Sequence, residues 1–157
     1  MQKEIKFAPT ETFETMLEWG VMPTFDLIIK QENKGIIIVK RKISPYKNVW
    51  ALPGLRQYKG EKHKETLERI ANKELALKIN PKSAKIIDQY DGFFSTEHNR
   101  QDMSTGYLIE ISKNQTVNFN KEHFSAIKYI NHKEEIPKNT GAMYKFYLHK
   151  YFEGKEN

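Results

Sequence analysis

The sequence contains no cysteine, and only four of its 26 basic residues are arginine. The lack of cysteine excludes a disulfide framework, a thiolate metal site and a thiol nucleophile. Its longest apolar run, at residues 36–39, is far shorter than the roughly 20 residues of a membrane-spanning helix. The first residues also lack the apolar stretch of a signal peptide. These absences predict a soluble, cytoplasmic protein with no membrane partner.

The 157 residues suit one folded domain, residues 1–157, because single cores usually contain roughly 100–200 residues. A hydrophobic share of 38% with 12% aromatic residues excludes an intrinsically disordered chain. The length is sufficient for a layered core without a stabilising metal or disulfide.

The formal net charge is +6, but the lysines are scattered along the chain rather than gathered into one block. Scattered lysine is typical of a solvated surface, so nucleic acid is not the favoured partner. The arginines are more informative, because three of the four lie between residues 41 and 69. A guanidinium group binds phosphate through two parallel hydrogen bonds, so an anionic small molecule is expected there.

Hydrophobic periodicity predicts strands that alternate with helices. Helices are expected over residues 10–19, 62–77 and from 140 onward, and strands over 21–30, 36–42, 50–52, 85–94, 107–112 and 126–130. The polar stretch over residues 95–105 is expected to be a loop. The pattern predicts an α/β (α+β) fold in which helices cover both faces of a mixed sheet, an α/β/α sandwich.

Residues 50–77 carry the clearest chemical signal. A short strand ends at a Pro-Gly turn, a basic loop follows, and an acid-rich helix begins. Such an arrangement can hold a divalent cation together with a phosphorylated ligand. Mg²⁺ takes oxygen ligands, commonly one or two carboxylates plus phosphate oxygens of the substrate.

The same segment resembles the Nudix box, the signature of hydrolases that act on nucleoside diphosphates linked to another moiety. That box reads G-x5-E-x7-R-E-U-x-E-E-x-G-U, where U is a bulky apolar residue. Glu61 falls on its first glutamate, Arg69 on its arginine and Glu74 on its last glutamate. Leu77 falls on the closing apolar position, and the preceding WALPG matches the usual lead-in. Glu61 is expected to pair with Arg69 and to hold the loop onto the helix.

Four positions depart from the box. Leu55 and Ala76 replace its two glycines, Ile70 replaces the glutamate after the arginine, and Lys73 replaces the first of the paired glutamates. Glycine in such turns usually marks a backbone geometry that a side chain would strain. A box that lacks two glutamates should not hold several metal ions.

Similar losses occur in the GDP-mannose mannosyl hydrolase branch of the Nudix family, which the first half of the chain resembles. The resemblance implies one Mg²⁺ or Mn²⁺ held by Glu74, by the backbone carbonyl of Gly54 and by a residue of a late loop. It also implies that Arg41 and Arg56 contact the diphosphate and assist its departure. Asp26 falls where that branch has an aspartate near the sugar.

That branch has a Gln-His pair in its late loop, and the pair can be aligned with this sequence in two ways. Counting back from Tyr129 places His123 on the ligand and Phe124 on the histidine. Allowing one inserted residue places Glu122 on the ligand and His123 on the histidine, which would be the general base. We favour the second alignment, because a carboxylate is the better ligand for a hard cation and imidazole the better base near neutral pH. In a third interpretation, His123 is an ordinary exposed histidine.

The resemblance therefore implies a metal-dependent hydrolase of a nucleotide sugar, in a chain that could form homodimers. One alternative is ordinary cleavage of the diphosphate in ADP-ribose or in nucleoside triphosphates. Another is a domain that has lost catalysis and binds a nucleotide or a partner. An RNA-associated Nudix protein is suggested by the net charge alone.

Overall fold

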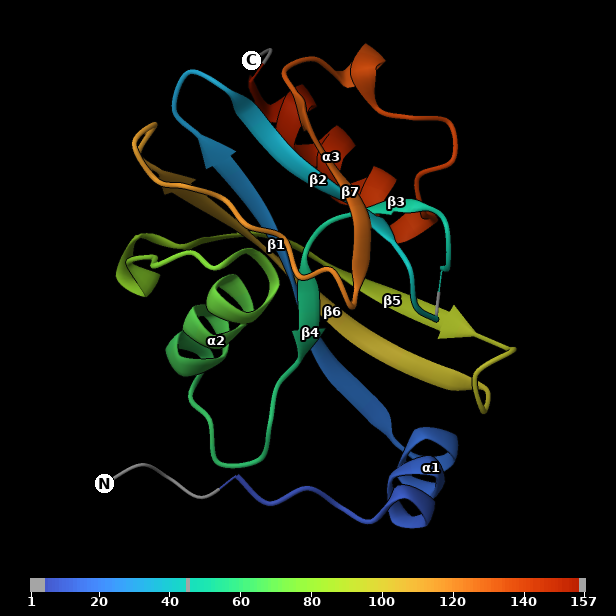
Figure 1. Ribbon diagram of the computed structural model, residues 1–157. Helices are drawn as coiled ribbons and strands as arrows, with labels where there is room; N and C mark the ends of the chain where they lie inside the picture. The colour runs from blue at the N-terminus through green and yellow to red at the C-terminus, as the bar shows by residue number, and fades with distance from the viewer. Residues whose placement is uncertain (1–4, 45, 156–157) are drawn as a thin grey trace.

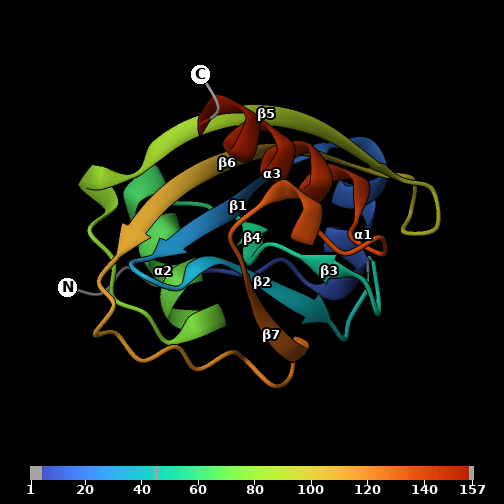
Figure 2. The ribbon, with the colours of Figure 1, turned by 90° about the horizontal axis from the view of Figure 1, so that it is seen from above.

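Helices α2 (His63–Leu75) and α3 (Ala142–Lys155) lie on opposite faces of a mixed β-sheet in the computed structural model, which describes residues 5–44 and 46–155 (Figure 1). The view from above shows α3 over one face of the sheet and α2 beneath the other (Figure 2). The remaining helical elements are α1 (Thr10–Trp19), η1 (Pro81–Ser83) and η2 (Lys133–Glu135). Helix α1 precedes the first strand and lies at one end of the sheet (Figure 1).

The described residues form seven strands of one sheet, with β3-β2-β1-β6-β5 as its main order. They are β1 (Val21–Gln31), β2 (Gly35–Arg41), β3 (Trp50–Ala51), β4 (Gly54–Arg56), β5 (Lys85–Phe94), β6 (Arg100–Ile111) and β7 (Phe124–Ile130). Strands β1 and β6 run parallel along eleven residue pairs, and the other pairs are antiparallel. The sheet is therefore mixed, as the sequence predicts.

Adjacent residues of β1 show how the layers are arranged, because neighbouring side chains of a strand point to opposite faces. The ring of Phe25 packs against the ring of His63 in α2, at 5.3 Å between centroids. Asp26 instead accepts a hydrogen bond from Ser104, which in turn accepts one from Tyr147 in α3. The predicted α/β/α sandwich is confirmed.

The centre of the sheet is apolar on both faces. Residues 27–29 of β1 and residues 36–39 of β2 are at most 1% exposed. Continuous apolar runs of this kind are expected where both faces of a sheet are covered. The core therefore fixes the middle of β1 and β2, the two strands that carry Asp26 and Arg41.

Two expectations from the sequence are corrected. Strand β6 begins at Arg100 rather than at Tyr107, so the predicted loop is reduced to residues 95–99. The polar residues at its start are held in the sheet because β6 pairs with β1 on one side and β5 on the other. Strand β4 also follows directly after the Pro-Gly turn, where a loop was expected, because it pairs with residues 24–26 of β1.

Among the described residues, no helix combines the length and the apolar character that crossing a bilayer requires.

Candidate active site

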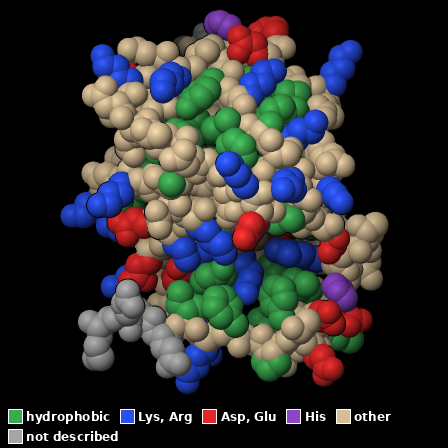
Figure 3. Space-filling model, in the orientation of Figure 1, with side chains coloured by type: hydrophobic (Ala, Val, Ile, Leu, Met, Phe, Trp, Pro, Cys, Tyr) green, Lys and Arg blue, Asp and Glu red, His purple; other side chains and the backbone are tan. Residues whose placement is uncertain are grey.

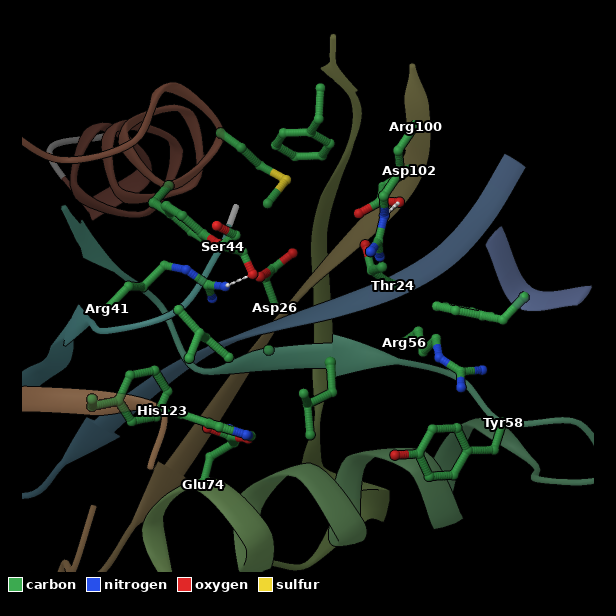
Figure 4. A pocket seen from close by; sticks show the side chains of 18 residues that line it. Thr24, Asp26, Arg41, Ser44, Arg56, Tyr58, Glu74, Arg100, Asp102 and His123 are labelled. Carbon is green, nitrogen blue, oxygen red and sulfur yellow. Dashed lines mark hydrogen bonds and ion pairs between the residues drawn. The ribbon is translucent and has the colours of Figure 1, made fainter. Parts of the chain in front are cut away.

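A cavity of about 270 Å³ opens where β1 changes partner along its length. Lys30 and Gln31 of β1 pair with β2, whereas residues 24–26 pair with β4. Because β2 and β4 lie beside different parts of β1, the end of β2 and the start of β7 meet β4 and α2 around the opening. The cavity is lined by Asp26, Arg41, Gly54, Arg56, Glu74, Arg100, Asp102 and His123, among others (Figure 4).

Glu74 is the most deeply buried acidic group of this cavity, with no exposed surface. It lies in the last turn of α2, whose neighbouring side chains Ile70, Ala71 and Leu75 pack into the core. Oε1 of Glu74 lies 2.7 Å from Nδ1 of His123, whereas Oε2 is buried and has no hydrogen-bond partner among the residues that the structure describes. Burial raises the pKa of Glu74 above its usual value, and the nearby His123 opposes this shift. One carboxylate oxygen is thus available for a ligand.

The loop before β7 places His123 against that carboxylate. The backbone N–H groups of Asn118 and Asn120 donate to the carbonyls of Leu75 and Glu74, at 3.0 and 2.8 Å. These carbonyls at the end of α2 have no partner within the helix, so the loop supplies one. The amides of His123 and Phe124 both return to the Asn120 carbonyl, which closes a tight turn.

The same turn directs Glu122 away from Glu74. Its side chain is exposed and does not line the cavity, although its backbone N–H donates to the side chain of Asn120. Of the two late-loop residues, His123 is therefore the one brought together with Glu74 and Gly54. The assignment of Glu122 as a metal ligand remains a prediction without geometric support.

Gly54 is required by the close approach of β4 to β1. A Cβ atom at this position would overlap Oδ1 of Asp26 and would lie 2.6 Å from the carbonyl oxygen of Phe25. Glycine alone therefore lets the backbone of the turn reach the Asp26 carboxylate. The structure brings together Gly54, Asp26 and Glu74 around one cavity, as the resemblance implies.

Asp26 ends a chain of buried hydrogen bonds. The hydroxyl of Tyr147 donates to Oγ of Ser104 at 2.8 Å, and Ser104 donates to Oδ2 of Asp26 at 2.5 Å. Burial raises the pKa of Asp26 to about 7, while the Ser104 hydrogen bond and the positive charge of Arg41 oppose the shift. The carboxyl group is therefore poised to exchange a proton near neutral pH.

Arginine side chains enter the cavity from different strands. Arg41 ends β2, and its Nη2 donates to the carbonyl of Ser44 at 3.4 Å. The guanidinium of Arg56 lies 4.5 Å from the ring centroid of Phe13 and 4.9 Å from that of Tyr58. The pKa of Arg56 is lowered from its usual value, mainly because the guanidinium is partly buried. A desolvated, stacked guanidinium offers its edge to an anion.

The box residues Glu61 and Arg69 form the predicted pair. Nε and Nη2 of Arg69 donate to the two Glu61 carboxylate oxygens at 2.7 and 2.9 Å. Nη2 of Arg69 also donates to the backbone carbonyl of Arg56 at 2.7 Å, and its guanidinium lies 3.6 Å from the Tyr58 ring centroid. The pair holds the loop onto α2, so the prediction is confirmed, and it also fixes the backbone that carries Arg56.

Sequence patterns alone miss part of the cavity. Arg100 and Asp102, joined by a 2.5 Å ion pair, lie in the stretch that was expected to be a loop. Phe94 at the end of β5 also lines the cavity, and the neighbouring Phe93 is 72% exposed. Tyr144 of α3 and Phe13 of α1 complete the wall. No local sequence pattern marks Asp102, because its place at the cavity follows from the parallel pairing of β6 with β1.

The oxygen atoms at the cavity suit a hard divalent cation that takes some of its ligands from the protein and the others from a substrate. No group of three or more His, Cys, Asp or Glu side chains that could hold a metal occurs within residues 5–44 and 46–155. Glu74 and His123 are nevertheless adjacent, and Oε2 of Glu74 lacks a partner. Mg²⁺ commonly takes only one or two protein carboxylates and completes its shell with water and phosphate oxygens.

The fold recurs in solved structures of low sequence identity. A MutT NUDIX hydrolase from Burkholderia pseudomallei is 16% identical, has a TM-score of 0.72, and the match covers 82% of this chain and 96% of that one. The NUDIX domain of NrtR from Shewanella oneidensis, complexed with ADP ribose, is 15% identical, with a TM-score of 0.68 and coverage of 87% and 89%.

A bifunctional NMN adenylyltransferase/ADP ribose pyrophosphatase from Francisella tularensis, complexed with AMP and a Mn ion, is 16% identical, with a TM-score of 0.65 and coverage of 87% of this chain and 42% of that one. The NUDIX domain family model matches residues 21–150, which include every cavity residue assigned above except Phe13. This match, together with the hydrolases among the structural neighbours, supports the assignment of the chain as a hydrolase. The chain belongs to the NUDIX domain family.

Proposed function

We propose that this chain is a divalent-metal-dependent hydrolase that cleaves a nucleoside diphosphate linked to another moiety, with a nucleotide sugar of the GDP-mannose type as its substrate. The observation that carries the proposal is the Glu74 carboxylate, which is fully buried at the cavity with one oxygen hydrogen-bonded to His123 and the other without a partner. A buried carboxylate oxygen without a hydrogen-bond partner is costly, and a cation bound at Oε2 would offset that cost.

In this proposal Oε2 of Glu74 and the carbonyl of Gly54 hold one Mg²⁺ or Mn²⁺. The ion would supply positive charge to the phosphate oxygens of the substrate. A Mn ion accompanies AMP in the Francisella tularensis neighbour, which supports the choice of metal. The resemblance to a one-metal branch with a reduced box agrees with the small number of acidic side chains at the cavity.

The arginines and His123 carry the remaining chemistry. Arg41 and Arg56 neutralise the charge that develops on the departing diphosphate, which is usually the largest catalytic contribution. Nδ1 of His123 lies within hydrogen-bond distance of Oε1 of Glu74. In the tautomer that this proposal requires, Nδ1 donates to Glu74 and Nε2 accepts a proton from the attacking water. Asp26, which lies beside Gly54, binds the sugar hydroxyls. Glu122 has no part in this arrangement, and its role as a ligand is the alternative that mutation can test.

A second candidate function is nucleotide binding without turnover. It is favoured by the absence, among the described residues, of a cluster of three metal-ligating side chains. The Shewanella oneidensis neighbour is a NUDIX domain complexed with ADP ribose. In this alternative the arginines and Asp26 hold the ligand, and Glu74 with His123 forms a structural pair.

The test is ³¹P NMR of the purified protein with Mg²⁺ or Mn²⁺ and nucleotide sugars, ADP-ribose or nucleoside triphosphates. We expect a nucleoside diphosphate from a nucleotide sugar, no product with Glu74→Gln, and full activity with Glu68→Gln, an exposed glutamate of the same helix. Nucleoside monophosphate as product would identify ordinary diphosphate cleavage instead. Binding without turnover at saturating metal would support the second candidate.

A further inference from the structure

A second cavity adjoins the first and shares a wall with it. This cavity has a volume of about 700 Å³ and is lined by the segment before α1, by α1 itself and by the loop between β4 and α2. Phe13, Arg56 and Tyr58 line both cavities, so Arg56 stands between them. Figure 3 shows Lys and Arg side chains between two groups of hydrophobic side chains in the lower half of this face.

The walls of the second cavity are aromatic. The rings of Phe7 and Tyr58 meet edge to face, at 5.0 Å between centroids. Phe13 and Tyr58 also lie within 5 Å of the Arg56 guanidinium, on which both rings pack. The Phe7 side chain remains 61% exposed despite its contact with Tyr58, and Met16 is 42% exposed. Planar aromatic ligands stack on surfaces of this kind, and every nucleobase has a face suited to such stacking.

The charge of this cavity favours an anion. Lys6, Arg56 and Lys59 line it, and Glu61 is the acidic residue among its lining groups. The Glu61 carboxylate is already paired with Arg69 through two hydrogen bonds. The cationic side chains are thus not offset by an unpaired carboxylate among the lining residues, and the phosphate on the ribose of a stacked nucleoside would meet Arg56.

The sizes of the two cavities also favour a ligand whose two ends occupy different cavities. Sites for small organic ligands typically enclose roughly 300–1,000 Å³. The first cavity, at about 270 Å³, lies just below this range, whereas the second lies within it. A diphosphate held at Arg56 and Glu74 would have one substituent in the first cavity and would direct the other past Arg56.

We propose that the second cavity is the subsite for the nucleobase of the substrate, which stacks on the exposed ring of Phe7 with Tyr58 beside it, while the phosphate of the same nucleotide contacts Arg56. This inference rests on the proposed function, because it takes a nucleoside diphosphate derivative as the ligand. It adds that the segment before α1, outside residues 21–150 that match the family model, contributes to binding. The sugar or other group then occupies the first cavity beside Asp26.

The experiment compares two ligands by isothermal titration with Mg²⁺ present: the α,β-methylene analogue of ADP or GDP, which resists cleavage, and inorganic pyrophosphate, which lacks a base. Phe7→Ala should weaken binding of the nucleotide analogue by about fivefold to a hundredfold, the usual effect of losing one stacked ring. It should leave pyrophosphate binding within about twofold. Phe7→Tyr should retain binding, and Phe93→Ala, which alters an exposed phenylalanine on β5, should change neither ligand.

A second measurement does not depend on any variant. Intermolecular NOEs between base protons and the rings of Phe7 and Tyr58 are expected in the wild-type complex. Equal losses for both ligands with Phe7→Ala, or no loss and no such NOEs, would overturn the subsite. If the wild-type protein hydrolyses its substrate and Phe7→Ala binds the nucleotide analogue as tightly as the wild type, the subsite alone would be refuted. A base bound at Phe7 without hydrolysis would refute the proposed hydrolase and retain the subsite.

Discussion

His123 Nδ1 lies 2.7 Å from Glu74 Oε1, although 49 positions separate the two residues. The contact depends on the loop that returns to the end of α2, where Asn120 donates to the carbonyl of Glu74 itself. A single turn thus satisfies the end of the helix and directs an imidazole to the buried carboxylate. Glu74 is buried, whereas the His123 side chain is 19% exposed, so the imidazole lies between the carboxylate and solvent.

This geometry predicts different results for neighbouring loop residues. His123→Asn should lower kcat by about 10²- to 10⁴-fold, the usual contribution of a general base, and should change the pH profile of kcat. Glu122→Gln should leave kcat and the affinity for Mn²⁺ within about twofold, because exposed side chains outside a site seldom matter. Steady-state kinetics and metal titrations of both variants provide the measurement. A larger loss of Mn²⁺ affinity in Glu122→Gln would restore Glu122 as the metal ligand.

Arg56→Lys tests whether the shape of the cation matters as well as its charge. The planar guanidinium packs on Phe13 and Tyr58, and an ammonium group cannot reproduce both that packing and a two-pronged contact with phosphate. We expect kcat/KM to fall by about tenfold to a hundredfold, equivalent to about 1.4 to 3 kcal/mol. Lys64→Arg, which alters an exposed lysine of α2 that lines neither cavity while keeping its charge, is the control. An Arg56→Lys variant with unchanged kcat/KM would show that charge alone suffices.

The raised pKa of Asp26 predicts that the protein becomes less stable as the pH rises. Its folded-state pKa is about 7, against 3.8 for the unperturbed carboxyl group, so the folded protein retains a proton that the unfolded chain loses between these values. The free energy of unfolding should therefore fall between about pH 4 and pH 7, by up to about 4 kcal/mol from this group. Relative to the wild type, Asp26→Asn should become more stable at pH 8 than at pH 4.

Urea unfolding of both proteins at several pH values measures this difference. Asp91→Asn, at an exposed position of β5, serves as the control for the loss of one carboxylate. A difference between wild type and Asp26→Asn that stays constant from pH 4 to pH 8 would contradict the raised pKa.

The local part of the site could be predicted from the sequence. Glu61, Arg69 and Glu74 lie within one loop and one helix, so their spacing along the chain fixes their spacing in space. Gly54 follows from the same local pattern, because the turn and the strand after it are continuous in sequence. The fold class followed from the alternation of strands and helices, which the long-range pairing preserves.

The remainder depends on pairing between distant segments. Asp102 and Ser104 lie in a polar stretch that is typical of a loop. Only the alignment of β6 between β1 and β5 places Asp102 at the cavity and Ser104 against Asp26. The orientation of His123 relative to Glu122 likewise depends on a turn anchored by Asn120. Phe7 lies outside the box in sequence and reaches the site through its contact with Tyr58.

Ala76 provides a test of strain at the end of α2. This residue has φ of 55° and ψ of 36°, where the Nudix pattern has a glycine, and its N–H closes the helix end on Asn72. A left-handed conformation costs an L-residue about 1–2 kcal/mol. Replacement by glycine removes this strain, but glycine also loses more backbone entropy on folding, which offsets part of the gain. Ala76→Gly should therefore raise the free energy of unfolding by about 0.5–1 kcal/mol, whereas Ala84→Gly, at φ of −65°, should lower it by a similar amount. Urea denaturation measures both changes, and a destabilised Ala76→Gly protein would show that Ala76 is not strained.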